Sequence, residues 1–256
     1  YAHLPLSDRL AIQFSARRSV TDVLNTPTYT NFTDRAFQDT QITTAGTQDS
    51  ERISARDENF YFYDFSGKVL YDLTEGQEFR LSGLFTRNNL FYAETLGADD
   101  SQNRSDLNQL NAGVSARLSS RWNNRFSSEI LGYYSQYELD SRYLTEASGQ
   151  SLFQLNQVKE TALKSRFRYR FNNLLSWDFG YQFIGTGISN ISDVNQPPFI
   201  SRIKDVVYAN ALFGEWNYSG PGGRLSARAG IRLNYLSNHE DFDRFCVERQ
   251  HERATI

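Results

Sequence analysis

The chain has 256 residues, a formal net charge of −3 and a mean hydropathy of −0.58. This small net charge gives no reason to expect nucleic-acid binding. A transmembrane helix is excluded because no run of about 18 apolar residues occurs. The single cysteine, Cys246, excludes an intramolecular disulfide and a cysteine-based metal cluster. A membrane β-barrel is not excluded, because only every second residue of its strands must be apolar.

The first third of the chain contains long segments in which apolar and polar residues alternate. This alternation predicts the end of a strand at residues 4–6, a strand over 9–20 and another over 59–73. A tight turn then leads into a strand over residues 79–91. Residues 21–57 are polar and are predicted to form a long loop.

The middle of the chain continues this pattern of strands and polar connections. A polar loop over residues 97–106 precedes the clearest single strand, residues 109–118. A turn over residues 121–124 leads to a strand over 126–139, whose facing the sequence does not define. Residues 140–151 are predicted to be a further loop.

Residues 163–183 give the strongest strand signal. In the first half, Phe167 and Tyr169 fall on one face and arginines fall on the other. Two asparagines, Asn172 and Asn173, then mark a turn. After the turn, large apolar side chains again occupy alternate positions: Leu175, Trp177, Phe179, Tyr181 and Phe183. Each run is about twice the usual strand length of roughly 5–6 residues, and a tilted strand needs such a length to cross a bilayer.

The last third predicts one more hairpin. A loop over residues 190–202 precedes a strand over 205–218, a turn over 220–223 and a strand over 225–235. The whole chain therefore predicts an all-β fold of about ten strands with no helix. We expect an antiparallel transmembrane β-barrel of the outer-membrane type.

The connections and tryptophans favour a membrane barrel over a soluble β-sandwich. Short turns alternate with longer polar loops, as periplasmic turns and outer loops do in outer-membrane barrels. Several aromatic residues lie beside the short turns and are predicted to sit at the membrane interface: Tyr71, Trp122, Phe171, Trp177 and Trp216. The alternative is that tryptophans near turns close a soluble core.

The face opposite the apolar positions is notably basic. We predict that its basic residues face a lumen: Arg17, Lys68, Arg117, Arg166, Arg168, Arg170, Arg228 and Arg232. An arginine facing lipid at the bilayer midplane would cost about 2–4 kcal/mol, so these residues require a polar environment. Two interpretations remain open: a water-filled lumen with paired charges, or a basic wall that holds an internal domain or conducts anionic solute.

Three segments resemble the barrel of TonB-dependent outer-membrane receptors, and the similarity is greatest to the type common in Bacteroidetes. The segments are residues 12–22 (IQFSARRSVTD), residues 60–64 (FYFYD) leading into a strand, and residues 229–235 (AGIRLNY). The similarity covers nearly the whole chain to about Val247. Position 20 is Val where the family often has an aromatic residue.

The resemblance implies a barrel of about 22 strands plugged by an N-terminal domain. Such a receptor takes up a siderophore, cobalamin or oligosaccharide across the bacterial outer membrane, with energy delivered by the TonB complex through the plug. On this basis we expect residues 1–256 to be one partial barrel domain, lacking the plug and the C-terminal strands. Residues 248–256 break the alternation and are expected to be an aberrant tail produced by truncation or a frameshift.

Catalytic, metal and cofactor sites are not expected. His239 lies among acidic residues in a predicted outer loop, where a solvated loop explains it better than a metal site. The segment from Asp99 resembles a calcium loop but lacks the glycine at position 6 and the glutamate at position 12, where Leu110 stands. We therefore expect a transporter and no enzyme. A passive porin-like channel is the alternative, and a soluble β-rich adhesion module a third.

Overall fold

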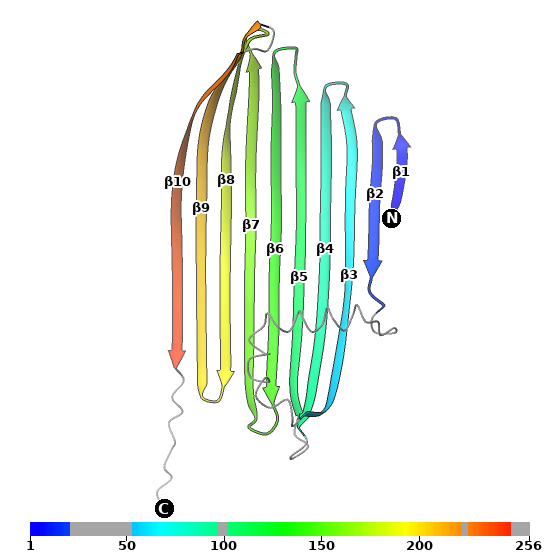
Figure 1. Cartoon of the computed structure of the whole chain (residues 1–256), viewed down its shortest axis with the longest axis vertical. Coiled ribbons are helices and arrows are strands. Elements are labelled where there is room, and N and C mark those ends of the chain that lie inside the picture. Colours follow the sequence, from blue (N-terminus) through cyan, green and yellow to red (C-terminus); the bar gives the residue numbers. More distant parts are fainter. Residues whose placement is uncertain (21–52, 97–101, 222–224, 247–256) are drawn as a thin grey trace, which may run out of the picture.

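The computed structural model describes residues 1–20, 53–96, 102–221 and 225–246, and these form one antiparallel sheet of ten strands. The strands lie side by side in the order in which they occur along the chain (Figure 1). β1 and β10 form the two edges and do not pair with each other, so the sheet is open. The strands are β1 (Ala2–Ser7), β2 (Leu10–Arg18), β3 (Ile53–Thr74), β4 (Gln77–Leu96), β5 (Gln102–Arg121), β6 (Phe126–Thr145), β7 (Gln150–Arg170), β8 (Leu175–Asn195), β9 (Pro198–Ser219) and β10 (Ser226–Cys246).

The predicted fold class is confirmed at this level: the described chain is all-β, antiparallel and built from ten strands. Strands β3 to β10 are unusually long, with 20 to 22 residues each. At about 3.3 Å per residue, such strands extend for roughly 65–70 Å. No helix in the described residues is long and apolar enough to cross a membrane.

Several predicted loops are wrong, because the strands continue through them. Much of the predicted loop over 97–106 belongs to β5, which begins at Gln102. The predicted loop over 140–151 shrinks to the turn between Thr145 and Gln150, and that over 190–202 to the turn between Asn195 and Pro198.

Two further loops were predicted too long. The predicted loop over 21–57 overlaps β3 from Ile53, and its residues 21–52 lie outside the described residues. The second is the predicted outer loop around His239. This residue lies within β10 instead and pairs with Val206.

These extensions were missed because their side chains are polar on both faces. Asn103 pairs with Thr145, and Asn156 pairs with Asn190, so neither face carries a run of apolar residues. Backbone hydrogen bonds hold such segments in the ladder whatever their side chains are. Amide side chains add to the pairing, since Asn89 donates to Asn108 at 2.9 Å.

The register gives the sheet two faces of different character, because directly paired residues share a face. One row of pairs runs through Phe126, Tyr169, Trp177 and Trp216, and we call this side the aromatic face. The other side, which we call the arginine face, contains Arg168 and its paired neighbours. The facing of β6, which the sequence left undefined, follows from Phe126.

The hairpins are displaced stepwise along the strand direction. Successive cross-strand pairs place Arg168 in one row with two other residues. These are Arg121, the last residue of β5, and Asp178, the fourth residue of β8. The same row reaches Gly230, the fifth residue of β10. The strands are therefore inclined to the line that joins the short turns.

Buried apolar residues are few, because the described residues form a single layer. Phe60 on β3 and Leu90 on β4 form one small buried cluster, packed against Phe62, Tyr92 and Leu107. A sheet of this size without a second layer leaves most of its large apolar side chains partly exposed.

Candidate functional site

The aromatic face carries a belt without charged residues beside the short turns. On β3 to β10, the aromatic-face positions are uncharged from the short turn to at least the middle of each strand. The first charged residues on this face include Arg87 on β4, Glu138 on β6, Lys159 on β7 and Lys204 on β9. This charge-free belt is about ten residues high.

The charge-free belt is also solvent-exposed. Val114 on β5 is 48% exposed, Leu163 on β7 46%, Leu212 on β9 58% and Ile231 on β10 68%. Contiguous exposed apolar surface of this extent is rare on soluble monomers and marks a surface that another apolar phase or molecule covers.

Aromatic rings line the turn end of the charge-free belt. Trp177 stacks on Trp216 with ring centroids 5.6 Å apart, and Phe171 stacks on Trp216 at 5.4 Å. Of the five predicted interface aromatics, the structure thus brings three together. Tyr71 on β3 and Trp122 after β5 lie apart from them but also beside short turns, and the Trp122 Nε1–H donates to Ser128 Oγ at 2.9 Å.

The register places all eight predicted basic residues on the arginine face, and seven of them lie on strands that also contribute to the charge-free belt. Arg17 pairs across the strands with Asp64, and Arg168 pairs with Asp178. The others follow from the same ladder: Lys68, Arg117, Arg166, Arg170, Arg228 and Arg232. At the height of the charge-free belt, charged side chains on β3 to β10 therefore lie on the arginine face and not on the aromatic face.

Three of these basic residues have a specific polar partner. The Arg17 Nε–H donates to Asp64 Oδ2 at 2.7 Å. The Arg232 Nη2–H donates to Gln182 Oε1 at 2.9 Å. Arg168 donates to both oxygens of Asp178, at 2.6 and 2.8 Å. None of the other five forms a salt bridge with any described residue.

Asp178 is the most enclosed charged residue of the arginine face, with 4% of its surface exposed. Besides the fork from Arg168, its Oδ2 accepts a hydrogen bond from Asn217 Nδ2 at 3.4 Å. Two-point contact between guanidinium and carboxylate is among the strongest polar contacts in proteins. This contact fixes the positions of β7 and β8 relative to each other.

A second polar cluster was missed by the sequence analysis. The Tyr133 Oη–H donates to Glu160 at 2.6 Å, and the Thr186 Oγ1–H donates to the same carboxylate at 3.2 Å. The Lys164 ammonium lies 5.1 Å from the centre of the Tyr133 ring. The undefined facing of residues 126–139 hid this cluster, because Tyr133 and Tyr134 are equally plausible on either face.

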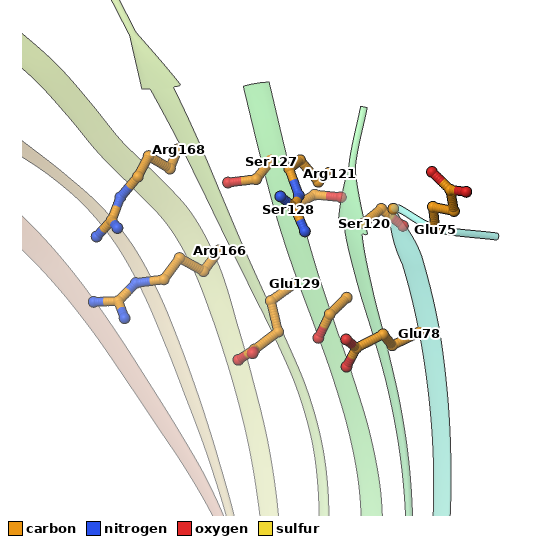
Figure 2. Close-up of a pocket in the computed structure, with 11 residues that line it drawn as sticks. Glu75, Glu78, Ser120, Arg121, Ser127, Ser128, Glu129, Arg166 and Arg168 are labelled. Atoms are coloured by element: carbon orange, nitrogen blue, oxygen red, sulfur yellow. The ribbon is translucent and has the colours of Figure 1, made fainter. Parts of the chain in front are cut away.

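At the turn end of the arginine face, two adjoining hollows are lined by residues from β4 to β7 and the turns beside them. The first, about 320 Å³, is lined by acidic residues from β4, β6 and the turn before β4, and by arginines from β5 and β7 (Figure 2). In this view Arg166 and Arg168 extend in the same direction, and their guanidinium ends point away from Glu78 and Glu129. The second hollow adjoins the first, because both are lined by Arg121, Ser127 and Arg168.

Within the described residues, no three His, Cys, Asp or Glu side chains are grouped so that they could hold a metal ion. The segment that resembles a calcium loop begins at Asp99, outside the described residues. No protein-family model matches the chain, and no curated protein is similar to it.

Proposed function

We propose that the chain forms part of the wall of a transmembrane β-barrel in a bacterial outer membrane. The aromatic face would lie against lipid and the arginine face against the lumen. The charge-free belt carries this proposal. A basic side chain on the lipid face would cost about 2–4 kcal/mol at the midplane, and basic residues at this height lie on the opposite face.

The height of the belt fits this proposal. About ten residues at 3.3 Å each, inclined by about 40°, span roughly 25 Å, which matches the apolar band of outer-membrane barrels. The stepwise displacement of the hairpins supports such an inclination, because a sheet closes into a barrel only with staggered strands. The remaining half of each long strand would rise above the membrane.

Closure of the barrel would need strands beyond the ten described. The unpaired edges of β1 and β10 would each expose a row of backbone donors and acceptors. Hydrocarbon does not tolerate such an edge. A barrel of about 22 strands, as the resemblance implies, would complete the pairing.

For the activity, we propose active uptake of a scarce nutrient by a receptor of the TonB-dependent type. The support is the resemblance of the segments near residues 12–22, 60–64 and 229–235. Five basic residues of the arginine face form no salt bridge with a described residue, which fits the wall around a plug domain, through which the TonB complex would act. The nutrient class, such as a siderophore, cobalamin or oligosaccharide, also follows from the resemblance. No catalytic role is proposed.

A passive porin-like channel is the second candidate, favoured by the same basic residues, which would suit a lumen for anionic solutes. A soluble adhesion module fits less well, because its sheet would leave the belt in water.

Transport in a bacterium that carries the gene separates the two channel types. We expect deletion of the gene to abolish growth on one limiting nutrient, and a protonophore to stop uptake in the parent strain. Uptake that persists after the proton gradient has collapsed would contradict active transport and favour the porin-like channel.

A further inference from the structure

The second hollow at the turn end of the arginine face, about 270 Å³ in volume, is lined by arginines and by no acidic residue. Arg121 comes from the end of β5, Arg125 from the turn before β6, and Arg168 and Arg170 from β7. In contrast, three glutamates line the neighbouring hollow. Four arginines line one hollow to which no acidic residue contributes, and this leaves an excess of positive charge.

Most of this charge has no salt-bridge partner among the residues that the structure describes. Arg168 is held by Asp178. Arg121, Arg125 and Arg170 form no salt bridge with any described residue. Three neighbouring cations repel one another unless an anion lies between them.

The polar groups between the arginines are also donors. Asn123 Oδ1 accepts hydrogen bonds from the backbone N–H groups of Arg125 and Phe126, at 2.8 and 2.9 Å. This use of its carbonyl oxygen leaves the Asn123 amide NH₂ group as the part available to a ligand. Ser127 adds a hydroxyl to the lining.

From this lining we infer that the hollow is a binding site for a soluble phosphate-bearing anion. Guanidinium groups bind phosphate oxygens through two parallel hydrogen bonds, and amide donors complete such a site. A volume of about 270 Å³ equals the volume of roughly nine water molecules in the liquid, which is ample for a pyrophosphate or a sugar phosphate. The inference requires the sheet alone and does not depend on the proposed transport.

Titration calorimetry with inorganic pyrophosphate, on the full chain in non-ionic detergent, tests this inference. We expect the triple variant R121Q/R125Q/R170Q to bind pyrophosphate at least about tenfold more weakly than the parent, because three charge-assisted contacts are lost. The matched control is R104Q/R142Q/R202Q, which removes the same charge from the aromatic face near the opposite ends of the strands. This control should stay within about twofold of the parent.

Two further variants separate a loss of binding from a loss of folding. R125Q alone lies in a turn and leaves the strands intact, so it should weaken binding by several-fold even if the triple variant does not fold. R170K keeps the charge but loses the planar fork, and should bind more tightly than R170Q. The inference is overturned if the parent does not bind pyrophosphate or binds only phosphatidylglycerol in mixed micelles. An equal loss in the control variant would also overturn it.

Discussion

At the scale of single residues, the contact between Arg168 and Asp178 shows how the arginine face is held together. Asp178 is almost fully enclosed, and an unpaired charge there would be costly. Two hydrogen bonds from Arg168 and one from Asn217 satisfy it. A buried ion pair is weak support for stability in general, but it specifies which residues of β7 and β8 must face each other.

Gly180, next to this pair on the arginine face, leaves no room for a side chain. A Cβ at this position would lie 2.7 Å from Phe213 Cζ and would clash with the Ser165 carbonyl oxygen. We predict that Gly180→Ala lowers the free energy of unfolding by about 1–3 kcal/mol, the usual cost of overpacking.

Urea unfolding in detergent, followed by tryptophan fluorescence, measures this loss. The matched control is Gly187→Ala on the same strand, where a Cβ would meet nothing within 4 Å. Equal stability of the two variants would contradict the packing around Gly180.

At the scale of the strand, the charge-free belt makes a prediction that separates lipid from water. Leu163 on β7 is already 46% exposed, so in a soluble protein Leu163→Arg would change stability by less than about 0.5 kcal/mol. Against lipid, the same change should cost about 2–4 kcal/mol.

Gln157 provides the control, because it lies on the same strand and face beyond the first charged position, Lys159. For the complete closed barrel in lipid vesicles, the midpoint of urea unfolding should fall for Leu163→Arg and stay nearly unchanged for Gln157→Arg. Equal midpoints for the two variants would argue against a lipid-facing belt.

The sequence allowed the turn-proximal half of each strand to be predicted, and the structure explains why the other half was missed. In residues 163–183, one face of each strand is apolar and the other is polar or charged. Apolar and polar residues therefore alternate strictly along the sequence, and this pattern predicts a strand. In segments such as 140–145 and 190–195, polar residues occupy both faces, and only backbone pairing makes them strands.

The candidate site was predictable to a similar extent. The facing of Arg168 followed from alternation, whereas its pairing with Asp178 depends on the register across a turn. The hollow with Arg121 and Arg125 joins residues from three separate elements, which no local pattern indicates.

At the scale of the whole molecule, the ten strands make one open sheet (Figure 1). The register staggers the strands and gives the sheet two unlike faces. Under the proposal, the sheet would cross the membrane with its turn-proximal half, and the rest would extend beyond the lipid. The central claim is thus that the aromatic face touches lipid over the charge-free belt and nowhere else.

Fluorophore labelling at single cysteines tests this claim most directly. In a Cys246→Ser background, a label is placed at Val114 in the belt, at Ser115 on the arginine face, or at Asp106 on the aromatic face above the belt. In vesicles that contain the complete closed barrel, we predict that brominated lipid quenches the label at Val114 and that aqueous iodide quenches the labels at Ser115 and Asp106. Quenching of all three labels by iodide, with none by brominated lipid, would contradict the account.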